Sequence, residues 1–311
     1  MIIQFSHPGK ELEIKQKSRK NGSSYIFNSS NSGFRFWNNE NDHKRKFLKH
    51  QGWYLENVGR TFDPTPKKGE LCFWGEWEPQ SEFELTGNSY STQPSLPHSV
   101  HMPIFSNRGK GRHNTDPFVF GEHFYYTNCK QKQTGKGLKM LCLPTHSIII
   151  FGSEKNKTDF AIDTLFVVGT SETVKDYNTH PNNYPDILRE ATIDLHGGLG
   201  HWHRLYQGKM YDFNNHYSTE KPYTFCFFPC KIDCKSTGFE RPVIDWKKLG
   251  LQKPGAYTVL VEVNYSSETD FWNEIVKEII MQGFSLGIKL EMPKNNDVMK
   301  LPDYEETKKK C

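Results

Sequence analysis

The sequence predicts an α+β protein with a strand-rich, mixed-sheet core, few helices and long functional loops. Two runs, 147–152 and 160–169, are rich in β-branched and aromatic residues and are separated by a polar connection. Runs of this length and composition are typical of buried strands, so we expect them to form a hairpin.

A second observation comes from the C-terminal part of the chain. Residues 257–263 and 286–291 have the pattern of strands, and Ser267 and Asp270 resemble a capping box before an apolar pattern. Phe271, Ile275 and Ile279 recur at helical spacing until Gly283, a residue that commonly ends helices. We therefore expect a β-α-β unit here.

The organisation of the chain follows from its length and its breaks. A chain of 311 residues can form one large core or two modest ones, and two lobes are the default expectation. The run Asp63-Pro64-Thr65-Pro66 predicts a boundary, because proline restricts the residue before it to extended conformations. The predicted units are a basic and aromatic N-terminal region (1–66), a strand-rich core with the candidate active site (67–255) and the C-terminal unit packed on that core (256–311).

Composition narrows the class of protein. The mean hydropathy is −0.74, but 14% of the residues are aromatic, which argues against disorder. No apolar run approaches the roughly 20 residues of a membrane helix, and the N-terminus has no export-signal pattern. The seven scattered cysteines do not resemble a disulfide framework. We therefore expect reduced thiols, a cytoplasmic location, and neither a membrane nor an obligate protein partner.

Positive charge is concentrated in two segments. Residues 1–70 hold 13 Lys and Arg against 7 Asp and Glu, and residues 101–140 hold 7 against 2, whereas the whole chain carries only +4. Basic segments beside an acidic remainder are typical of a surface that meets a polyanion, although solvated faces of no special role remain an equal alternative. DNA is the expected partner.

The densest acidic candidate is the segment 74–81, which includes Glu76 and Glu78. If this segment is a strand that ends at Pro79, the two carboxylates share one face and Trp77 lies on the other. Carboxylates crowded in apolar surroundings repel one another and lose hydration, which is how an acid or base near neutral pH is made. The alternative is an exposed edge strand.

Two further acids are candidates. Asp116 ends a basic loop and precedes Pro117 and an aromatic stretch, so it could meet a ligand or simply make a turn. Asp163 interrupts an apolar strand and, if buried, must be paired, hydrogen-bonded or protonated. Tyr125, Tyr126 and Asn128 could stack on a base or bind its edge, or they could pack in the core.

A zinc site is weakly supported. His196, His201 and His203 precede Cys226, Cys230 and Cys234, but no Cys-x2-Cys pair occurs. We therefore expect no metal and no cofactor, and we interpret His201, Trp202 and His203 as a loop that could contact nucleic acid. P-loop, Rossmann, esterase-elbow and zinc-deaminase motifs are missing from the sequence, which leaves carboxylate-assisted hydrolysis as the favoured chemistry.

The segments 73–81, 116–131, 147–168 and 197–204 resemble bacterial anti-phage DNA glycosylases, which excise glucosylated hydroxymethylcytosine from phage DNA. This resemblance implies a flipped, hypermodified base, hydrolysis of its N-glycosidic bond and an abasic product. The catalytic carboxylate would then be Glu76 or Glu78, followed by Asp116 and Asp163. The resemblance itself assigns no site residue; from their chemistry, the residues expected to bind DNA are Lys44, Arg45, Lys46, Arg108, Lys110, Arg112, Trp53, Trp77, Tyr125, Tyr126, Asn128, His201, Trp202 and His203.

Two other functions stay open. A non-catalytic reader of modified nucleic acid would use the same basic and aromatic residues without cutting. A hydrolase of free nucleotides or nucleotide-sugars would use the acids, but its ligand affinity would depend only weakly on salt, because few counterions are released.

Overall fold

The computed structural model describes most of the chain. The described residues are 1–7, 9–12, 32–35, 44–79, 81–105, 116–127, 129, 131, 140–155, 159–193, 204–214, 217–218, 220, 222–234, 237–253 and 259–295. Their architecture is a strand-rich α+β fold with mixed sheets and few helices, as predicted.

The first sheet is built around a central parallel pair. Its strands follow the order β13 (Val259–Val263), β1 (Ile2–His7), β8 (Ile148–Lys155), β9 (Asp159–Thr173), β10 (Arg204–Gly208) and β7 (Tyr125–Tyr126), and β12 (Val243–Ile244) also pairs with β9. The hairpin of β8 and β9 is confirmed. β1 is parallel to β8, and all six of its residues are buried, because it lies between two strands from distant parts of the chain.

The second sheet contains two strands of the basic N-terminal region, β2 and β3, together with later strands. Its order is β14 (Ser285–Leu290), β11 (Phe228–Ile232), β4 (Lys67–Gly75), β3 (Lys46–Leu55), β6 (Ser99–Phe105), β5 (Ser81–Leu85) and β2 (Ser32–Arg35), and β15 (Lys294–Asn295) pairs with β6. β3 and β4 form an antiparallel hairpin, and β14 pairs with β3 as well as β11. The three predicted segments therefore share both sheets through strand pairing.

The C-terminal β-α-β unit is confirmed as secondary structure. The helix α3 (Glu268–Met281) begins at Ser267, whose hydroxyl accepts a hydrogen bond from the Asp270 N–H. Its buried face includes Phe271, Ile275 and Ile279, the residues that predicted it. Its two flanking strands enter different sheets, β13 the first and β14 the second. The remaining helical segments are short: α1 (Val174–Thr179), α2 (Asp186–Leu188), η1 (Met140–Cys142), η2 (Pro181–Asn183) and η3 (Arg189–Ile193).

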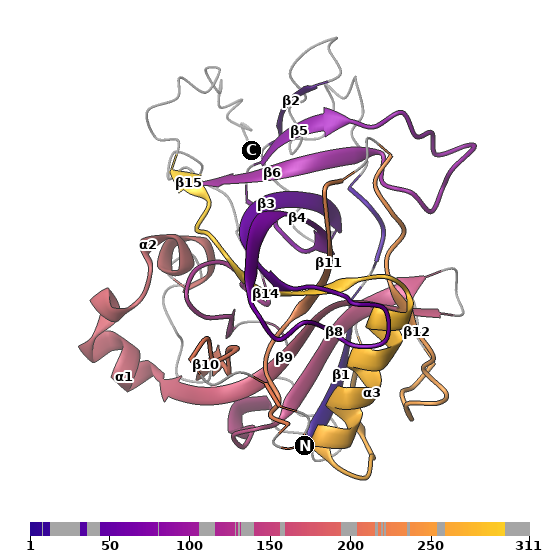
Figure 1. Cartoon of the computed structure of the whole chain (residues 1–311). Coiled ribbons are helices and arrows are strands. Elements are labelled where there is room, and N and C mark those ends of the chain that lie inside the picture. Colours follow the sequence, from indigo (N-terminus) through magenta and orange to yellow (C-terminus); the bar gives the residue numbers. More distant parts are fainter. Residues whose placement is uncertain are drawn as a thin grey trace.

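The two sheets share one core. Phe227, just before β11, exchanges backbone hydrogen bonds with Leu165 of β9, at 2.8 and 3.0 Å, and so joins the sheets directly. Buried apolar side chains from both sheets and α3 belong to one cluster. Figure 1 shows β5 and β6 at one end of the molecule, β8 and β9 at the other, and α3 beside the first sheet. Among the described residues, one large core cluster therefore spans both sheets, and a small second cluster contains Phe47, Cys72 and Trp74.

The cysteines differ from the expectation. Cys72 of β4 and Cys234 after β11 form a disulfide, with their Cα atoms 5.9 Å apart, because β4 and β11 are neighbouring strands. The prediction that every thiol is reduced is wrong for this pair. Cys226 and Cys230 are free and fully buried, whereas Cys142 is exposed. No helix among the residues described is long and apolar enough to cross a membrane.

Burial predicts unequal reactivity of the free thiols. The pKa of Cys226 is raised to about 12 by burial, and that of Cys230 is raised as well, so neither forms the reactive thiolate at pH 8. We expect a maleimide probe to label Cys142 in the native protein and to leave Cys226 and Cys230 unlabelled until urea unfolds the chain. Peptide mapping by mass spectrometry identifies the labelled residues, and native labelling of Cys226 would contradict this packing.

Candidate active site

The acids predicted from separate segments meet between the two sheets. Glu76, Asp116 and Asp163 line one pocket, together with Arg45. All four side chains are buried. Phe73, Trp74 and Phe151 also line the pocket. Charged groups inside a wall of rings have little water around them, so their electrostatic interactions are strong.

The pocket is narrow. The volume that the centre of a water molecule can occupy is about 10 Å³, which is enough for about one water. A nucleobase therefore does not fit into it in this conformation, and its walls would have to move for a base to enter.

Asp163 is placed by a bulge in β9. Phe151 of β8 pairs with Thr164 and the next residue, Gly152, pairs with Ile162, so Asp163 is the extra residue between them. The bulge needs a glycine opposite it, because a Cβ on Gly152 would lie 2.3 Å from the Ala161 carbonyl oxygen. The bulge therefore accounts for the acid in an otherwise apolar strand.

Both oxygens of Asp163 are paired with arginines. Arg45 Nε lies 2.8 Å from Oδ2, and Arg241 Nη2 lies 2.7 Å from Oδ1. Burial lowers the pKa of Arg45, but Asp163 and Glu76 raise it further and outweigh that effect. Burial lowers the pKa of Arg241, although a guanidinium still stays charged. Of the alternatives expected for a buried Asp163, paired, hydrogen-bonded or protonated, the structure shows pairing with two arginines.

Glu76 follows β4 and links Arg45 to His7. Its Oε1 lies 2.9 Å from Arg45 Nη1, and its Oε2 lies 3.0 Å from His7 Nδ1. β4 ends at Gly75, so the prediction that Glu76 and Glu78 share one face of a strand is wrong, because the strand stops before both. Both carboxylates are nevertheless buried, which excludes the exposed edge strand.

Asp116 comes from a different loop. Its oxygens accept hydrogen bonds from the backbone N–H of Thr127, at 3.3 Å, and of Cys129, at 2.7 Å. The bond to Pro117 is cis. Asp116 thus holds the segment after β7 as well as lining the pocket, and these two bonds reach residues 11 and 13 positions along the chain, unlike the local bond of the turn interpretation.

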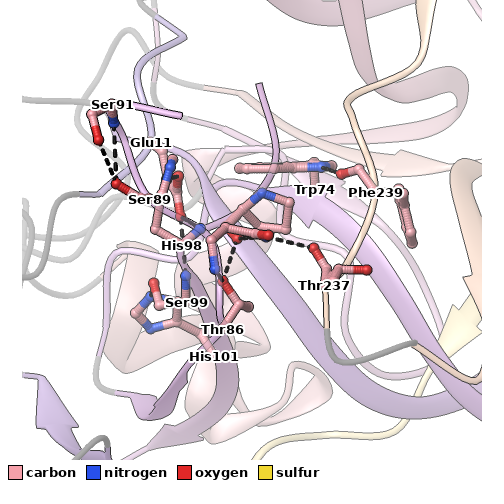
Figure 2. Close-up of polar contacts among 12 residues, drawn as sticks. Glu11, Trp74, Thr86, Ser89, Ser91, His98, Ser99, His101, Thr237 and Phe239 are labelled. Carbon is pink, nitrogen blue, oxygen red and sulfur yellow. Dashed lines mark hydrogen bonds and ion pairs between the residues drawn. The ribbon is translucent and has the colours of Figure 1, made fainter. Parts of the chain in front are cut away.

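Arg45 is fixed through its backbone by a second buried cluster. Its N–H and carbonyl bond to Lys10 and Leu12, at 2.9 and 2.8 Å, and Glu11 between them is partly buried beside the buried His98. Figure 2 shows this cluster: Glu11 accepts hydrogen bonds from His98 Nδ1 (2.5 Å), His98 N–H (2.8 Å) and Ser99 N–H (3.3 Å). Burial raises the pKa of Glu11, and His98 opposes the rise. The cluster anchors the segment that positions Arg45.

Several residues predicted to bind DNA have other roles. Lys46 is buried and donates to the Pro79 carbonyl oxygen at 2.9 Å, and Arg45 belongs to the buried ion pairs. Trp77 packs on Phe118 and Phe120 in the core. Side chains enclosed by the protein do not contact phosphates or bases on its surface, so the prediction is corrected for Arg45, Lys46, Trp77, Tyr125 and Tyr126.

Of the other predicted DNA contacts, two are described. Lys44 is partly exposed, and the ring of Trp53 lies 4.9 and 4.8 Å from the ammonium groups of Lys68 and Lys289. The remaining predictions, Arg108, Lys110, Arg112, Asn128, His201, Trp202 and His203, lie outside the described residues, as does His196. Within the described part of the chain, no group of His, Cys, Asp or Glu could hold a metal ion.

Sequence reasoning missed two members of the site. His7 ends an apolar run before Pro8, which marks the end of a strand but not a role. Arg241 precedes Pro242 and carries no local signal, yet it donates to the Gly9 carbonyl oxygen at 3.2 Å as well as to Asp163.

Comparison with protein-family models, curated proteins and solved structures finds no match to this chain.

Proposed function

We propose that the protein is a DNA glycosylase that hydrolyses the N-glycosidic bond of a flipped, hypermodified cytosine in phage DNA and leaves an abasic site. The observation that carries this proposal is the charge of the pocket wall, which contains the carboxylates of Glu76, Asp116 and Asp163 and the single guanidinium of Arg45. The resemblance to anti-phage glycosylases supplies the substrate class.

The excess of carboxylates suits the reaction. Cleavage of an N-glycosidic bond develops positive charge on the sugar, by analogy with glycoside hydrolysis, and a buried carboxylate stabilises that charge. A phosphoryl group in the pocket would instead meet like charge at short distance. This charge pattern favours glycosidic cleavage over chemistry on a phosphate group.

The size of the pocket suits a water nucleophile. Its volume accommodates about one water beside Asp116 and Glu76. A carboxylate can orient such a water and accept its proton, which typically contributes about 10²–10⁴ to the rate. The sugar would then stand at the mouth of the pocket, and the base would enter only after its walls move. No cofactor takes part in this scheme.

The test uses two matched duplexes, one with glucosylated hydroxymethylcytosine and one unmodified. We expect strand breaks after alkali only in the modified duplex, together with release of the modified base detected by mass spectrometry. Breaks in both duplexes, or in neither, would reject the proposal.

Carboxylate variants distinguish a glycosylase from a reader. Glu76→Gln and Asp116→Asn are expected to reduce excision by about 100-fold while DNA binding persists, because each removes an acid or base from the pocket. Glu84→Gln is the matched control, since Glu84 is exposed on β5. Retention of phage restriction by both pocket variants would favour the reader, and thermal unfolding of each variant checks that it folds.

A further inference from the structure

The ion pairs of the site form a continuous chain. Arg241 contacts Asp163, Asp163 contacts Arg45, Arg45 contacts Glu76, and Glu76 contacts His7. Arg241 also donates to the carbonyl oxygen of Gly9, two residues from His7. Arg241, the first member of the series, therefore also contacts the segment that holds His7, the last member. Glu76 is held from two sides, by Arg45 and by His7.

The two ends of this series of ion pairs differ in chemistry, because one is an arginine and the other a histidine. Arginine does not release its proton in proteins, so both partners of Asp163 carry a permanent charge. Histidine titrates near neutral pH, so the contact between His7 and Glu76 can hold one shared proton. His7 is 2% exposed, and its ring also packs edge-on against Phe5, with centroids 4.4 Å apart.

We infer that His7 is the positioning residue of the site, and that the His7–Glu76 pair supplies the proton that the departing base accepts. This inference rests on the proposed glycosylase function. The C1′–N bond breaks and its electron pair passes to the base, which takes the proton of the pair. The oxygen of a water molecule attacks C1′, and the proton that it loses goes to Asp116. One water is consumed; the pair then recovers a proton from solvent, and Asp116 releases the proton it accepted to solvent.

The charged groups that the ion pairs link to His7 come from four segments. Glu76 follows β4, Arg45 immediately precedes β3, Asp163 belongs to β9, and Arg241 precedes β12. Glu76 is in direct contact with the imidazole, at 3.0 Å. A negative partner at this distance favours the protonated ring, so loss of Glu76 should weaken proton binding by His7.

The test compares two variants. His7→Asn keeps a hydrogen-bond donor near the position of Nδ1 but cannot titrate, and His7→Phe has neither a donor nor a titratable group. We expect His7→Asn to lower kcat about 10-fold with little change in KM and to flatten the acidic side of the pH–rate profile, and His7→Phe to lower kcat about 100-fold. His180→Asn is the control, because His180 is exposed. Unchanged kcat and pH profile in both His7 variants would overturn the inference.

A second measurement is independent of activity. The imidazole signals of His7, followed by NMR against pH, should titrate at a lower pH in Glu76→Gln than in the wild type. If the wild type is active and the titration of His7 is unchanged in Glu76→Gln, only this inference is overturned and the proposed function stands. An inactive wild type on modified DNA overturns the proposed function itself, whatever the His7 titration shows.

Discussion

Replacement of Arg45 with methionine is expected to lower the free energy of unfolding by about 3–5 kcal/mol. The change keeps most of the volume but leaves Glu76 and Asp163 buried without the guanidinium that lies 2.9 and 2.8 Å from them. Removing one partner of a buried ion pair costs far more than removing an exposed one, because the remaining charge cannot regain its hydration. Urea unfolding followed by tryptophan fluorescence measures the loss.

The control for this prediction is the neighbouring residue. Lys44 is partly exposed, so Lys44→Met should change the free energy of unfolding by less than about 1 kcal/mol. A loss of the same small size for Arg45→Met would mean that the two carboxylates are hydrated or protonated in the folded protein, and it would remove the electrostatic basis of the proposed site.

The second large effect is expected at Trp272 of α3. Its Nε1 donates to the Phe225 carbonyl oxygen at 2.9 Å, and its ring lies 4.7 Å from that of Phe225 and 5.9 Å from that of Phe227, measured between centroids. Trp272→Ala should lower the free energy of unfolding by about 3–5 kcal/mol, because it leaves a cavity and an unpaired carbonyl. Differential scanning calorimetry should show a matching fall in Tm.

The same helix provides the comparison. Met281 is 69% exposed at the C-terminal end of α3, so Met281→Ala should leave Tm nearly unchanged. Since Phe227 is the residue that joins β11 to β9, a small effect of Trp272→Ala would indicate that the helix contributes little to the connection between the sheets.

Local sequence patterns predicted the elements whose residues form them through short-range spacing and capping, the β8–β9 hairpin and α3. The hairpin of β8 and β9 is visible in its β-branched residues, and α3 is visible in Ser267, Phe271, Ile275 and Ile279. The end of β4 at Gly75 was missed, because the alternation of residues 74–78 continues after the backbone leaves the sheet. Local periodicity does not report where pairing with a neighbouring strand stops.

The sequence pointed to the acidic residues of the pocket, but it predicted that Arg45 and Lys46 bind DNA, whereas both are buried. A buried acid in an apolar strand is conspicuous, so Asp163 could be picked out from its neighbours alone. A lysine or arginine in a basic run gives no such signal: Arg45 and Lys46 resemble the partly exposed Lys44 in sequence, and only the folded chain shows that they are buried. Arg241 and His7 are separated from their partners by up to 78 residues, a relation that no local pattern encodes.

The position of β1 has a consequence for synthesis of the protein. β1 is translated early, yet its partners β8 and β13 lie at residues 148–155 and 259–263. A nascent chain therefore carries an unpaired apolar strand until most of the polypeptide has been made, and pairing over such sequence distances is slow. Because His7 is the last residue of that strand, the ion pairs that link it through Glu76, Arg45 and Asp163 to Arg241 can form only after residue 241 has been made.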